Sequence, residues 1–367
     1  MTYVVSYTVR KTTTEEKQNS MPYLTSSMIE AVNTCPRWGI VRNVQRRAMV
    51  TGFRQMALEA GSHMHDIFAA FNFWNLAVIQ GYKEHAIHHF VQLFGAGRAN
   101  AVDFAKSVKD ADPADVRILD NLAYKMSATS EFYDDPNDKN RTLSNLEFCA
   151  SMLAEYYMLH HVNFPIYVAD KDDPTKPIGI EQSLDVVFNC TTDDDEVFSI
   201  RFIGLADAVY QDPVTNLVTL GEYKTTSGMN DAWHEAFRTR HQITAYNGAL
   251  AAYFSDNVSY NTILTGSAIP VRKTTQPVEH FTVQRDVENV LDFLTTAIFA
   301  QEMIEQYKQS DVINAPMFTH SCNRYFRPCS MLDFCTAAND DRFVMWSNMS
   351  ELEELSPSEQ RAMLHNE

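Results

Sequence analysis

The feature that most constrains the fold is a run of apolar–polar alternation between residues 166 and 225. Four segments, IYVAD, IGIEQSLDVVFNC, VFSIRFIGLADAVYQ and LVTLGEYKT, are rich in Val, Ile, Phe and Tyr, and they repeat with the period of two that a half-buried strand requires. The QDPVTN between the last two is typical of a turn. We therefore predict consecutive strands, the last two of which form an antiparallel hairpin.

Helical periodicity lies on both sides of this run. Before it, helices are expected over MIEAVNTCPRW and MALEAGSHMHDIFAAFNFWNLAVI, and residues 83–161 stay helical with acidic, Asp/Pro-rich breaks. After it, we expect one long helix over Asp231–Phe254, strands over NTILTGSAIPV and VEHFTVQR, and a helix over Asp286–Gln309. The prediction is an α/β protein with a mixed central sheet flanked by helices and a helical insertion at about residues 83–161.

The ends of the chain differ from its body. Residues 1–20 are polar and are expected to be loose or to form an edge element, and the body is predicted to cover residues 21–335. Residues 336–367 are acidic and are expected to be an appendage. Within it, Ser356, Pro357 and Glu359 form a capping-box start for a short helix.

The charge of the chain is unevenly distributed. A formal net charge of -17 argues against a nucleic-acid ligand, yet residues 31–58 hold five arginines and no acid. This pattern is compatible with a basic groove on an acidic body, and equally with solvated helix faces. The arginines are Arg37, Arg42, Arg46, Arg47 and Arg54.

Neither a secretory signal nor an apolar run of membrane-spanning length is found in the sequence. We therefore expect no membrane partner and a cytoplasmic location.

The predicted hairpin carries the residues best suited to chemistry. Asp207 lies 15 positions before Glu222 with the turn midway, so the two carboxylates are expected close together. Lys224, two residues beyond Glu222, lies on the same face of its strand. Two carboxylates can hold Mg²⁺, and a neighbouring lysine can orient an attacking water. From these residues alone, a surface hairpin with a solvated Glu and Lys remains the alternative.

Two further motifs lie on the helices before and after the hairpin. Gly61 and His65 form G-x-x-x-H, and Gln242 and Tyr246 form Q-x-x-x-Y. With the strand aspartate and E-x-K between them, the ordered pattern resembles that of the RecB-like nucleases of the PD-(D/E)xK superfamily. The resemblance extends from Ser26 to Cys335 and implies a restriction-endonuclease-like fold.

The resemblance also implies roles for individual residues. His65, Asp207, Glu222 and the carbonyl of Tyr223 would bind Mg²⁺ or Mn²⁺, and Lys224 would be the catalytic lysine. His63 is a second candidate for the histidine ligand, but the glycine spacing favours His65.

Beyond the metal ligands, the helix after the hairpin is the candidate DNA contact. Gln242, Tyr246 and Arg238 are spaced one helical turn apart, so we expect them to share a face that contacts DNA. Without that context, Tyr246 would be interpreted as a half-buried core tyrosine. Glu181 is a weaker acidic candidate near the sheet and is left outside the catalytic set.

Four cysteines form the second strong pattern. Three of them fall within fourteen residues, and the fourth lies 287 positions upstream. Several nucleases of the RecB-like family, among them the CRISPR spacer-acquisition nucleases, hold a 4Fe-4S cluster on one cysteine before the nuclease core and three after it. Four thiolates suit iron–sulfur or zinc, and the six residues between Cys322 and Cys329 depart from the short C-x-x-C step of the commonest family spacing. The four are Cys35, Cys322, Cys329 and Cys335, while Cys149 and Cys190 are expected in the core.

These patterns together predict a metal-dependent DNA nuclease with an iron–sulfur cluster. The resemblance favours an exonuclease that acts on DNA ends in recombination or repair. The sequence lacks a P-loop, so a helicase or recombination partner would be a separate chain. A non-catalytic iron–sulfur DNA-binding or scaffold protein and a zinc-stabilised RNA-processing enzyme are the alternatives.

Overall fold

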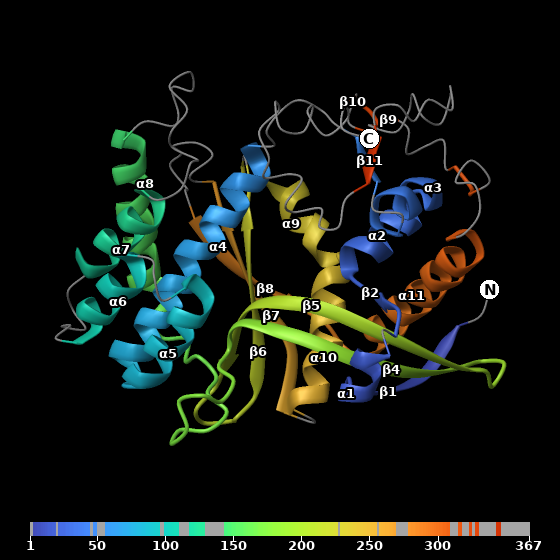
Figure 1. Ribbon diagram of the computed structural model, residues 1–367, viewed down its shortest axis with the longest axis horizontal. Coiled ribbons are helices and arrows are strands. Elements are labelled where there is room, and N and C mark those ends of the chain that lie inside the picture. Colours follow the sequence, from blue (N-terminus) through green and yellow to red (C-terminus); the bar gives the residue numbers. More distant parts are fainter. Residues whose placement is uncertain are drawn as a thin grey trace. The chain divides into compact units, whose positions relative to one another are not determined.

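The computed structural model shows an α/β protein with a seven-stranded, mostly antiparallel open sheet flanked by helices (Figure 1). Its strands are hydrogen-bonded in the order β1-β4-β5-β6-β7-β8, with β2 beside β5. This confirms the predicted α/β class. The structure describes residues 3–19, 21–44, 47–49, 56–95, 99–109, 117–128, 143–226, 228–254, 257–268, 278–308, 315–317, 323–324, 327–329 and 343–345.

The secondary-structure elements have the following bounds. The helices are α1 Thr14–Gln18, α2 Ser26–Thr34, α3 Pro36–Gly39, α4 Met56–Trp74, α5 Lys83–Phe94, α6 Ala99–Lys109, α7 Arg117–Ala128, α8 Leu143–Tyr156, α9 Asp231–Arg238, α10 His241–Phe254 and α11 Val287–Tyr307. Turns of π-helix, η1 Ile40–Val44, η2 Asn75–Ile79 and η4 Tyr157–His161, extend α3, α4 and α8. The strands are β1 Val4–Lys11, β2 Tyr23–Leu24, β3 Arg47–Met49, β4 Ile180–Thr192, β5 Val197–Gln211, β6 Val218–Thr225, β7 Val258–Ser267, β8 Val278–Gln284, β9 Asn323–Arg324, β10 Arg327–Pro328 and β11 Phe343–Met345.

The chain divides into two compact units. The first consists of Met1–Gln55, Asp185–Gly204 and Val287–Glu367. Within it, β1 runs antiparallel to β4 at the end of the strand order, so part of the polar N-terminal segment is an edge strand. The helix that follows begins at a capping box formed by Thr13 and Glu16. Of the acidic tail, residues 343–345 pair with β3, and the helix predicted at Ser356 lies outside the described residues.

The second unit consists of Met56–Leu184 and Leu205–Asp286. Here β5 and β6 form the predicted antiparallel hairpin, and β7 and β8 form another. β6 and β7 are parallel, which requires a crossover, and α9 and α10 supply it. In the turn of the first hairpin, Asp212 Oδ1 accepts the N–H groups of Val214 and Thr215, each at 2.8 Å, and Asn216 has a φ of 58°. Asn tolerates this left-handed conformation, as the turn prediction required.

The core of the second unit is formed by helices packed on one face of the hairpin. The described residues of 83–161 are largely helical, in agreement with the periodicity. Helix α4 packs against α5 and α7 and also against β6 of the sheet, and it is apolar on several faces, as expected of a buried helix. Phe68, Phe71 and Trp74 of α4 are each 0% exposed, and Tyr223 of β6 belongs to the same cluster.

Three predicted elements differ from the structure. The helix expected over MIEAVNTCPRW is interrupted at Cys35, whose backbone is extended between α2 and α3, because Pro36 follows it and begins a new helix. IYVAD makes only isolated bridges, Ile166 to Tyr210 and Val168 to Ile178. The acidic residues that follow fold into local turns, in which Asp173 Oδ1 accepts from Thr175 N at 3.0 Å, so the extended run ends early.

The single long helix predicted over Asp231–Phe254 is two helices in the structure, α9 and α10. The break between them lies at residues 239–240. Arg285 holds this break: Nη2 donates to the carbonyl of Phe237 at 2.8 Å and Nε donates to Thr244 Oγ1 at 2.8 Å. The carbonyl of Phe237 would otherwise bond within a continuous helix.

Candidate metal centre

The hairpin register brings the predicted acidic pair together. Ala208 pairs with Gly221, and the same register extended by one residue sets Asp207 opposite Glu222. The N–H of Tyr223 donates to Asp207 Oδ2 at 2.7 Å, which ties the aspartate to the neighbouring strand. The two carboxylates therefore lie near each other at the end of the β5–β6 ladder away from the turn, as the 15-residue spacing predicted.

Gly221 in the GEYKT motif serves the packing of the hairpin. A Cβ on Gly221 would lie 2.5 Å from a ring carbon of Tyr210 and 2.9 Å from the Cβ of Ala208. Side-chain atoms do not approach so closely. The glycine therefore leaves the space in which the Tyr210 ring lies against β6.

Helix α4 places His65 against the aspartate. Its Nδ1 lies 3.0 Å from Asp207 Oδ1, and its side chain is 30% exposed whereas that of Asp207 is 6% exposed. One turn further along α4, the ring of Phe68 stacks on that of Tyr223, with centroids 4.4 Å apart and planes 14° apart. The side chain of His63, the other candidate, lies outside the described residues.

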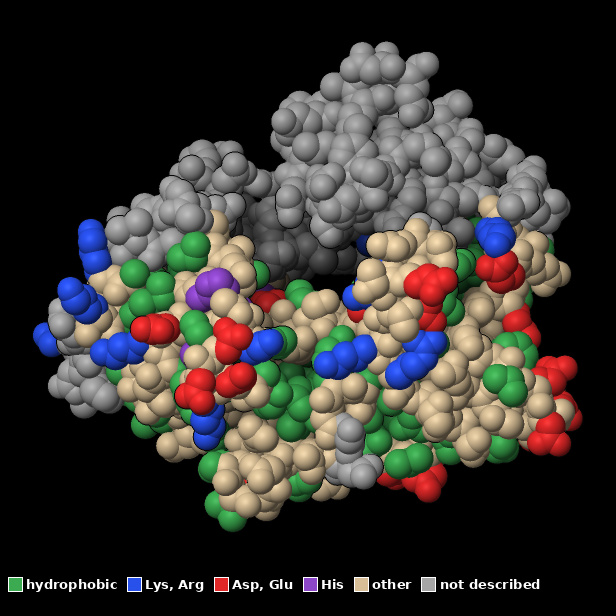
Figure 2. Space-filling model, turned by 60° about the horizontal axis from the view of Figure 1, so that its bottom comes forward, with side chains coloured by type: hydrophobic (Ala, Val, Ile, Leu, Met, Phe, Trp, Pro, Cys, Tyr) green, Lys and Arg blue, Asp and Glu red, His purple; other side chains and the backbone are tan. Residues whose placement is uncertain are grey.

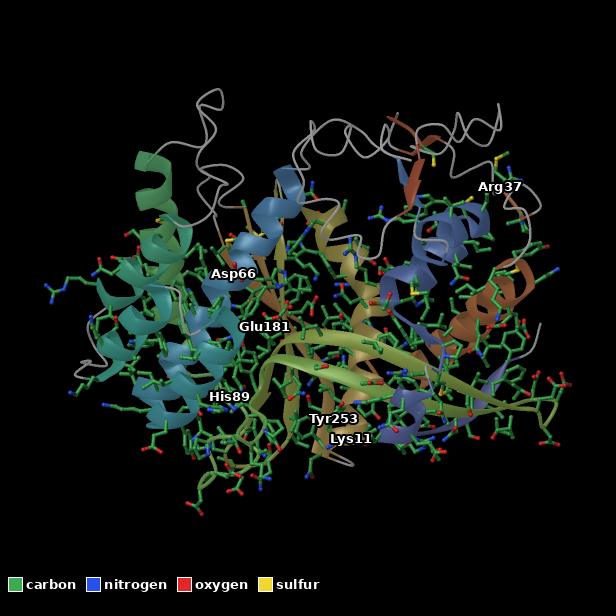
Figure 3. The ribbon with its side chains drawn as sticks, viewed as in Figure 1. Lys11, Arg37, Asp66, His89, Glu181 and Tyr253 are labelled. Carbon is green, nitrogen blue, oxygen red and sulfur yellow. The ribbon has the colours of Figure 1, made fainter. Side chains whose placement is uncertain are left out.

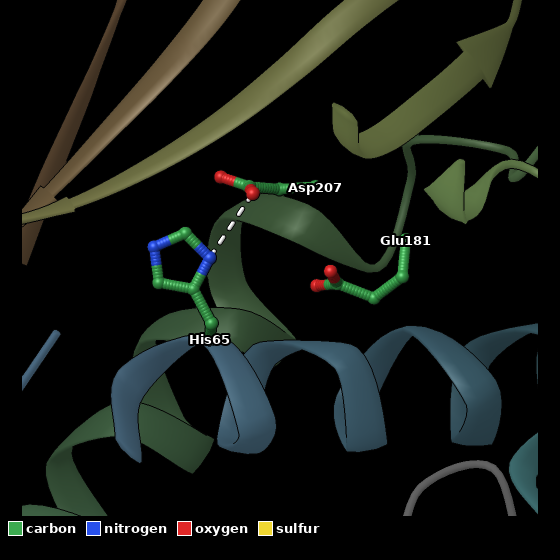
Figure 4. A group of neighbouring side chains, drawn as sticks. All are labelled: His65, Glu181 and Asp207. Atoms are coloured by element: carbon green, nitrogen blue, oxygen red, sulfur yellow. Dashed lines mark ion pairs between the residues drawn. The ribbon is translucent and has the colours of Figure 1, made fainter. Parts of the chain in front are cut away.

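Glu181, which the sequence indicated only as a weaker acidic candidate outside the catalytic set, lies in the same group as His65 and Asp207. Ligand atoms of His65, Glu181 and Asp207 all lie within 4.8 Å of one another, and Figure 4 shows the Glu181 carboxylate on the same side of α4 as the imidazole. Metal ligands about 2.1 Å from an ion are about 4.2 Å apart when opposite, so a small inward movement would allow the three to share one ion. Among the described residues, these three form the only such group of His, Cys, Asp and Glu.

The backbone of Glu181 is strained. Its φ is 48°, a left-handed conformation that a glutamate adopts rarely. Such conformations cost about 1–3 kcal/mol and cluster at functional sites. The exposed Asp66 of α4 lies near Glu181 (Figure 3) and its charge contributes to raising the pKa of that carboxyl. No local sequence signal indicated this placement, because it depends on how the start of β4 meets α4.

Glu222 and Lys224 form a buried pair beside this group. Lys224 Nζ donates to Glu222 Oε1, and the Glu222 side chain is 1% exposed. The second carboxylate oxygen of Glu222, Oε2, has no hydrogen-bond partner within the described part of the chain. A buried unpartnered carboxylate oxygen is unfavourable, and a cation is one way to satisfy it.

The charges at the site perturb one another strongly. Burial, followed by the negative charge of Asp207, raises the pKa of Glu181 to about 8 and that of Glu222 to about 7. Burial lowers the pKa of His65, but the charge and hydrogen bond of Asp207 outweigh it and raise the value to about 9. Burial likewise opposes ionisation of Asp207, yet His65 brings its pKa below the ordinary value.

These shifts indicate a site with three carboxylates and, among the residues that the structure describes, only two cationic side chains, those of His65 and Lys224. One histidine with two carboxylates is a donor set for a hard or intermediate divalent cation such as Mg²⁺ or Mn²⁺, so the residues fit the predicted metal. The carbonyl of Tyr223 stays a predicted ligand.

The Q-x-x-x-Y pair lies beside the buried lysine. Gln242 Nε2 donates to the hydroxyl of Tyr246 at 3.3 Å, and Tyr246 is only 6% exposed. Burial raises the pKa of Tyr246, and the charge of Glu222 raises it further. Tyr246 is thus a buried neighbour of the Glu222–Lys224 pair. Its burial resembles that of the core tyrosine that the alternative interpretation described.

Arg238 does not share that helix face. It is the last residue of α9, its side chain is 72% exposed, and its Nε lies 3.4 Å from Glu235 Oε2. The prediction of one continuous face was wrong because the helix breaks after Arg238.

A basic groove is likewise not evident in the described residues. Figure 2 shows basic and acidic side chains interspersed over the face that it draws. The Nε of Arg37 donates to the carbonyl of Ala315 at 3.1 Å, and the guanidinium of Arg42 lies over the ring of Trp38. The side chains of Arg46, Arg47 and Arg54 lie outside the described residues.

The cysteine pattern is only partly described. Cys35 is buried between α2 and α3, where Pro36 begins the second helix, and Cys329 is half-buried; neither is in a disulfide. Cys322 and Cys335 lie outside the described residues, as does the side chain of Cys149, while Cys190 is buried in β4 as expected.

The segment that precedes the three C-terminal cysteines contacts α3. The N–H of Arg37 donates to the carbonyl of Pro316 at 3.1 Å, and Arg37 Nε donates to that of Ala315. Residues 315–316 therefore lie within hydrogen-bond distance of the second residue after Cys35.

Comparison with known proteins adds no identification. The sequence matches no protein-family model, and it has no match among curated proteins.

The helices that the structure describes include none with the length and apolar character needed to cross a membrane.

Proposed function

We propose that this protein is a metal-dependent DNA nuclease of the RecB-like type. The observation that carries the proposal is the convergence of His65, Glu181 and Asp207 beside the buried Glu222–Lys224 pair. A fold of the restriction-endonuclease type is part of the proposal. The carboxylate-bearing hairpin and the helical crossover from β6 to a parallel β7 support it.

His65, Glu181 and Asp207 would hold the ion, and Glu222 would add a ligand through its unpartnered Oε2. A bound divalent cation supplies a water of lowered pKa and neutralises charge on the phosphate under attack.

Lys224 would act on the reacting groups directly. Burial lowers the pKa of its ammonium, but the charges of Glu222 and Asp207 outweigh this effect and raise it. The lysine therefore keeps its proton at neutral pH. From this position it would orient the attacking water and balance negative charge that develops on the phosphate.

The choice of DNA as substrate rests on the resemblance in motif order. On the same basis we propose that the protein acts as an exonuclease at DNA ends in recombination or repair. A helicase or recombination protein would be a separate partner chain. Gln242 and Tyr246 of α10 would orient the strand near the scissile phosphate, and their proximity to the Glu222–Lys224 pair supports this role.

A four-cysteine iron–sulfur cluster is part of the same proposal. Cys35, Cys322, Cys329 and Cys335 would hold it. Support comes from the hydrogen bonds between Arg37 and residues 315–316, which bring the chain ahead of the C-terminal cysteines to the neighbourhood of Cys35. The cluster would tie together two ends of the chain that are 287 positions apart.

Cleavage of labelled DNA tests the proposed function. End-labelled linear DNA should be degraded with Mg²⁺ or Mn²⁺, and covalently closed circles should be largely spared. Lys224→Ala and Glu222→Gln should lose cleavage, whereas Lys176→Ala, a change in an exposed loop outside the site, should keep it. A wild-type protein that binds DNA without cutting it under all these conditions would refute the nuclease and favour the scaffold alternative.

A further inference from the structure

A chain of buried hydrogen bonds runs through the core behind the metal centre. The hydroxyl of Tyr157 donates to Asn72 Oδ1 at 2.8 Å, and Asn72 Nδ2 donates to the hydroxyl of Tyr223 at 2.8 Å. The hydroxyls of Tyr223 and Tyr210 are 2.7 Å apart. All four residues are at most 3% exposed, and they come from α4, η4, β5 and β6.

Tyr223 connects this chain to the site. It is the middle residue of E-x-K, and its own N–H holds Asp207 Oδ2 at 2.7 Å. Its ring stacks on Phe68, which lies three residues after His65 on α4. The position of Tyr223 therefore fixes where Asp207 lies relative to β6. It also fixes the distance between β6 and α4, the helix that carries His65.

The chemistry of the chain suits a device that fixes position. Ring stacking alone leaves Tyr223 free to slide along Phe68, because dispersion has little directional preference. The hydroxyl of Tyr223, held by Asn72 from one helix and by Tyr210 from the adjacent strand, allows one placement of the ring. Burying these polar groups is unfavourable unless all are paired, and a fully paired network specifies one arrangement of the core.

We infer that the Tyr157–Asn72–Tyr223–Tyr210 hydroxyl chain is a positioning device for the metal centre, with Tyr223 as its central positioning residue. The inference rests on the proposed function only in that a divalent cation binds at His65, Glu181 and Asp207. Outer partners that orient metal ligands commonly change metal affinity by about 10–100-fold when removed. Loss of one hydroxyl from the chain should therefore weaken the metal before it affects the chemistry at saturating metal.

Manganese binding measured by electron paramagnetic resonance tests the inference without reference to cleavage. Tyr223→Phe and Tyr210→Phe each remove one hydroxyl and keep the ring. Each should bind Mn²⁺ about ten-fold more weakly than the wild type. Cleavage by the variants should need correspondingly more Mn²⁺ and approach the wild-type rate when Mn²⁺ saturates. Tyr167→Phe, which removes the same atom from a half-buried tyrosine outside the chain, should bind Mn²⁺ like the wild type.

The outcomes separate this inference from the nuclease proposal. If both chain variants fold and bind Mn²⁺ with wild-type affinity, the chain only stabilises the core and the inference is wrong, whether or not DNA is cut. If the chain variants bind Mn²⁺ more weakly than the wild type but the wild type cuts no DNA, the inference is supported and the nuclease proposal is wrong. If the wild type binds no Mn²⁺, both fall. Should Tyr223→Phe fail to fold, Tyr210→Phe decides.

Discussion

Without divalent cations, the stability of the protein should fall as the pH rises from 7 to 9. Three groups have pKa values raised by the folded site: Glu222 to about 7, Glu181 to about 8 and His65 to about 9, against ordinary values of 4.5, 4.5 and 6.5. Each holds its proton more tightly in the folded chain than in the unfolded chain. Its contribution to stability is therefore complete below the unfolded pKa and is lost as the pH rises through the folded pKa.

The size of the effect follows from the three values. One pKa unit corresponds to about 1.4 kcal/mol. Between pH 7 and 9, the stabilising contribution of Glu181 falls by the equivalent of about one pKa unit. That of His65 falls by about one and a half units, and that of Glu222 by a fraction of one. The free energy of unfolding should therefore fall by roughly 4 kcal/mol. His161, whose pKa burial lowers to about 3, contributes no slope here because its unfolded value of 6.5 lies below the window.

Denaturant unfolding in EDTA at pH 7, 8 and 9 measures this slope. Saturating Mg²⁺ should reduce or reverse it, because the ligands bind a cation in their deprotonated forms. Glu181→Gln should remove about a third of it, whereas Glu235→Gln, whose side chain is 67% exposed on α9, should leave it unchanged. A stability in EDTA that is constant or rises from pH 7 to 9 would refute the charge assignment at the site.

Three further predictions concern the scaffold. Gly221→Ala should lower the free energy of unfolding by about 1–3 kcal/mol in denaturant titration, because the new Cβ collides with the ring of Tyr210; a neutral change would contradict the packing argument. Arg285→Met should cost about 2 kcal/mol in the same assay, since its charged hydrogen bonds link α9 to α10, and an unchanged midpoint would remove Arg285 as the cause of the helix break. Protein purified without oxygen should contain iron that Cys35→Ser loses and Cys190→Ser retains; stoichiometric zinc in place of iron would overturn the cluster.

Local sequence patterns were sufficient to predict the hairpin. The alternation in β5 and β6, the turn residues between them and the 15-residue spacing are properties of adjacent segments, and together they set Asp207 opposite Glu222. The periodicity of α4 likewise placed His65 on a helix before the strands. These predictions needed no knowledge of distant contacts.

The features that the sequence did not predict depend on contacts between distant segments. The break between α9 and α10 is held by Arg285, which lies 48 residues after Phe237, the residue whose carbonyl it binds. The placement of Glu181 requires a left-handed residue at the start of β4 and the approach of α4. The hydroxyl chain that runs through Tyr223 joins four elements, and each of its members has the sequence context of an ordinary core residue.

The location of a bound metal tests the central claim most directly. Crystals soaked in Mn²⁺ and measured at the manganese absorption edge should show an anomalous peak about 2.2 Å from donor atoms of His65, Glu181 and Asp207. Glu181→Gln crystals should show a weaker peak at the same place. No peak at these three residues, in a protein that still degrades linear DNA with Mn²⁺, would contradict the assignment of this site as the catalytic centre.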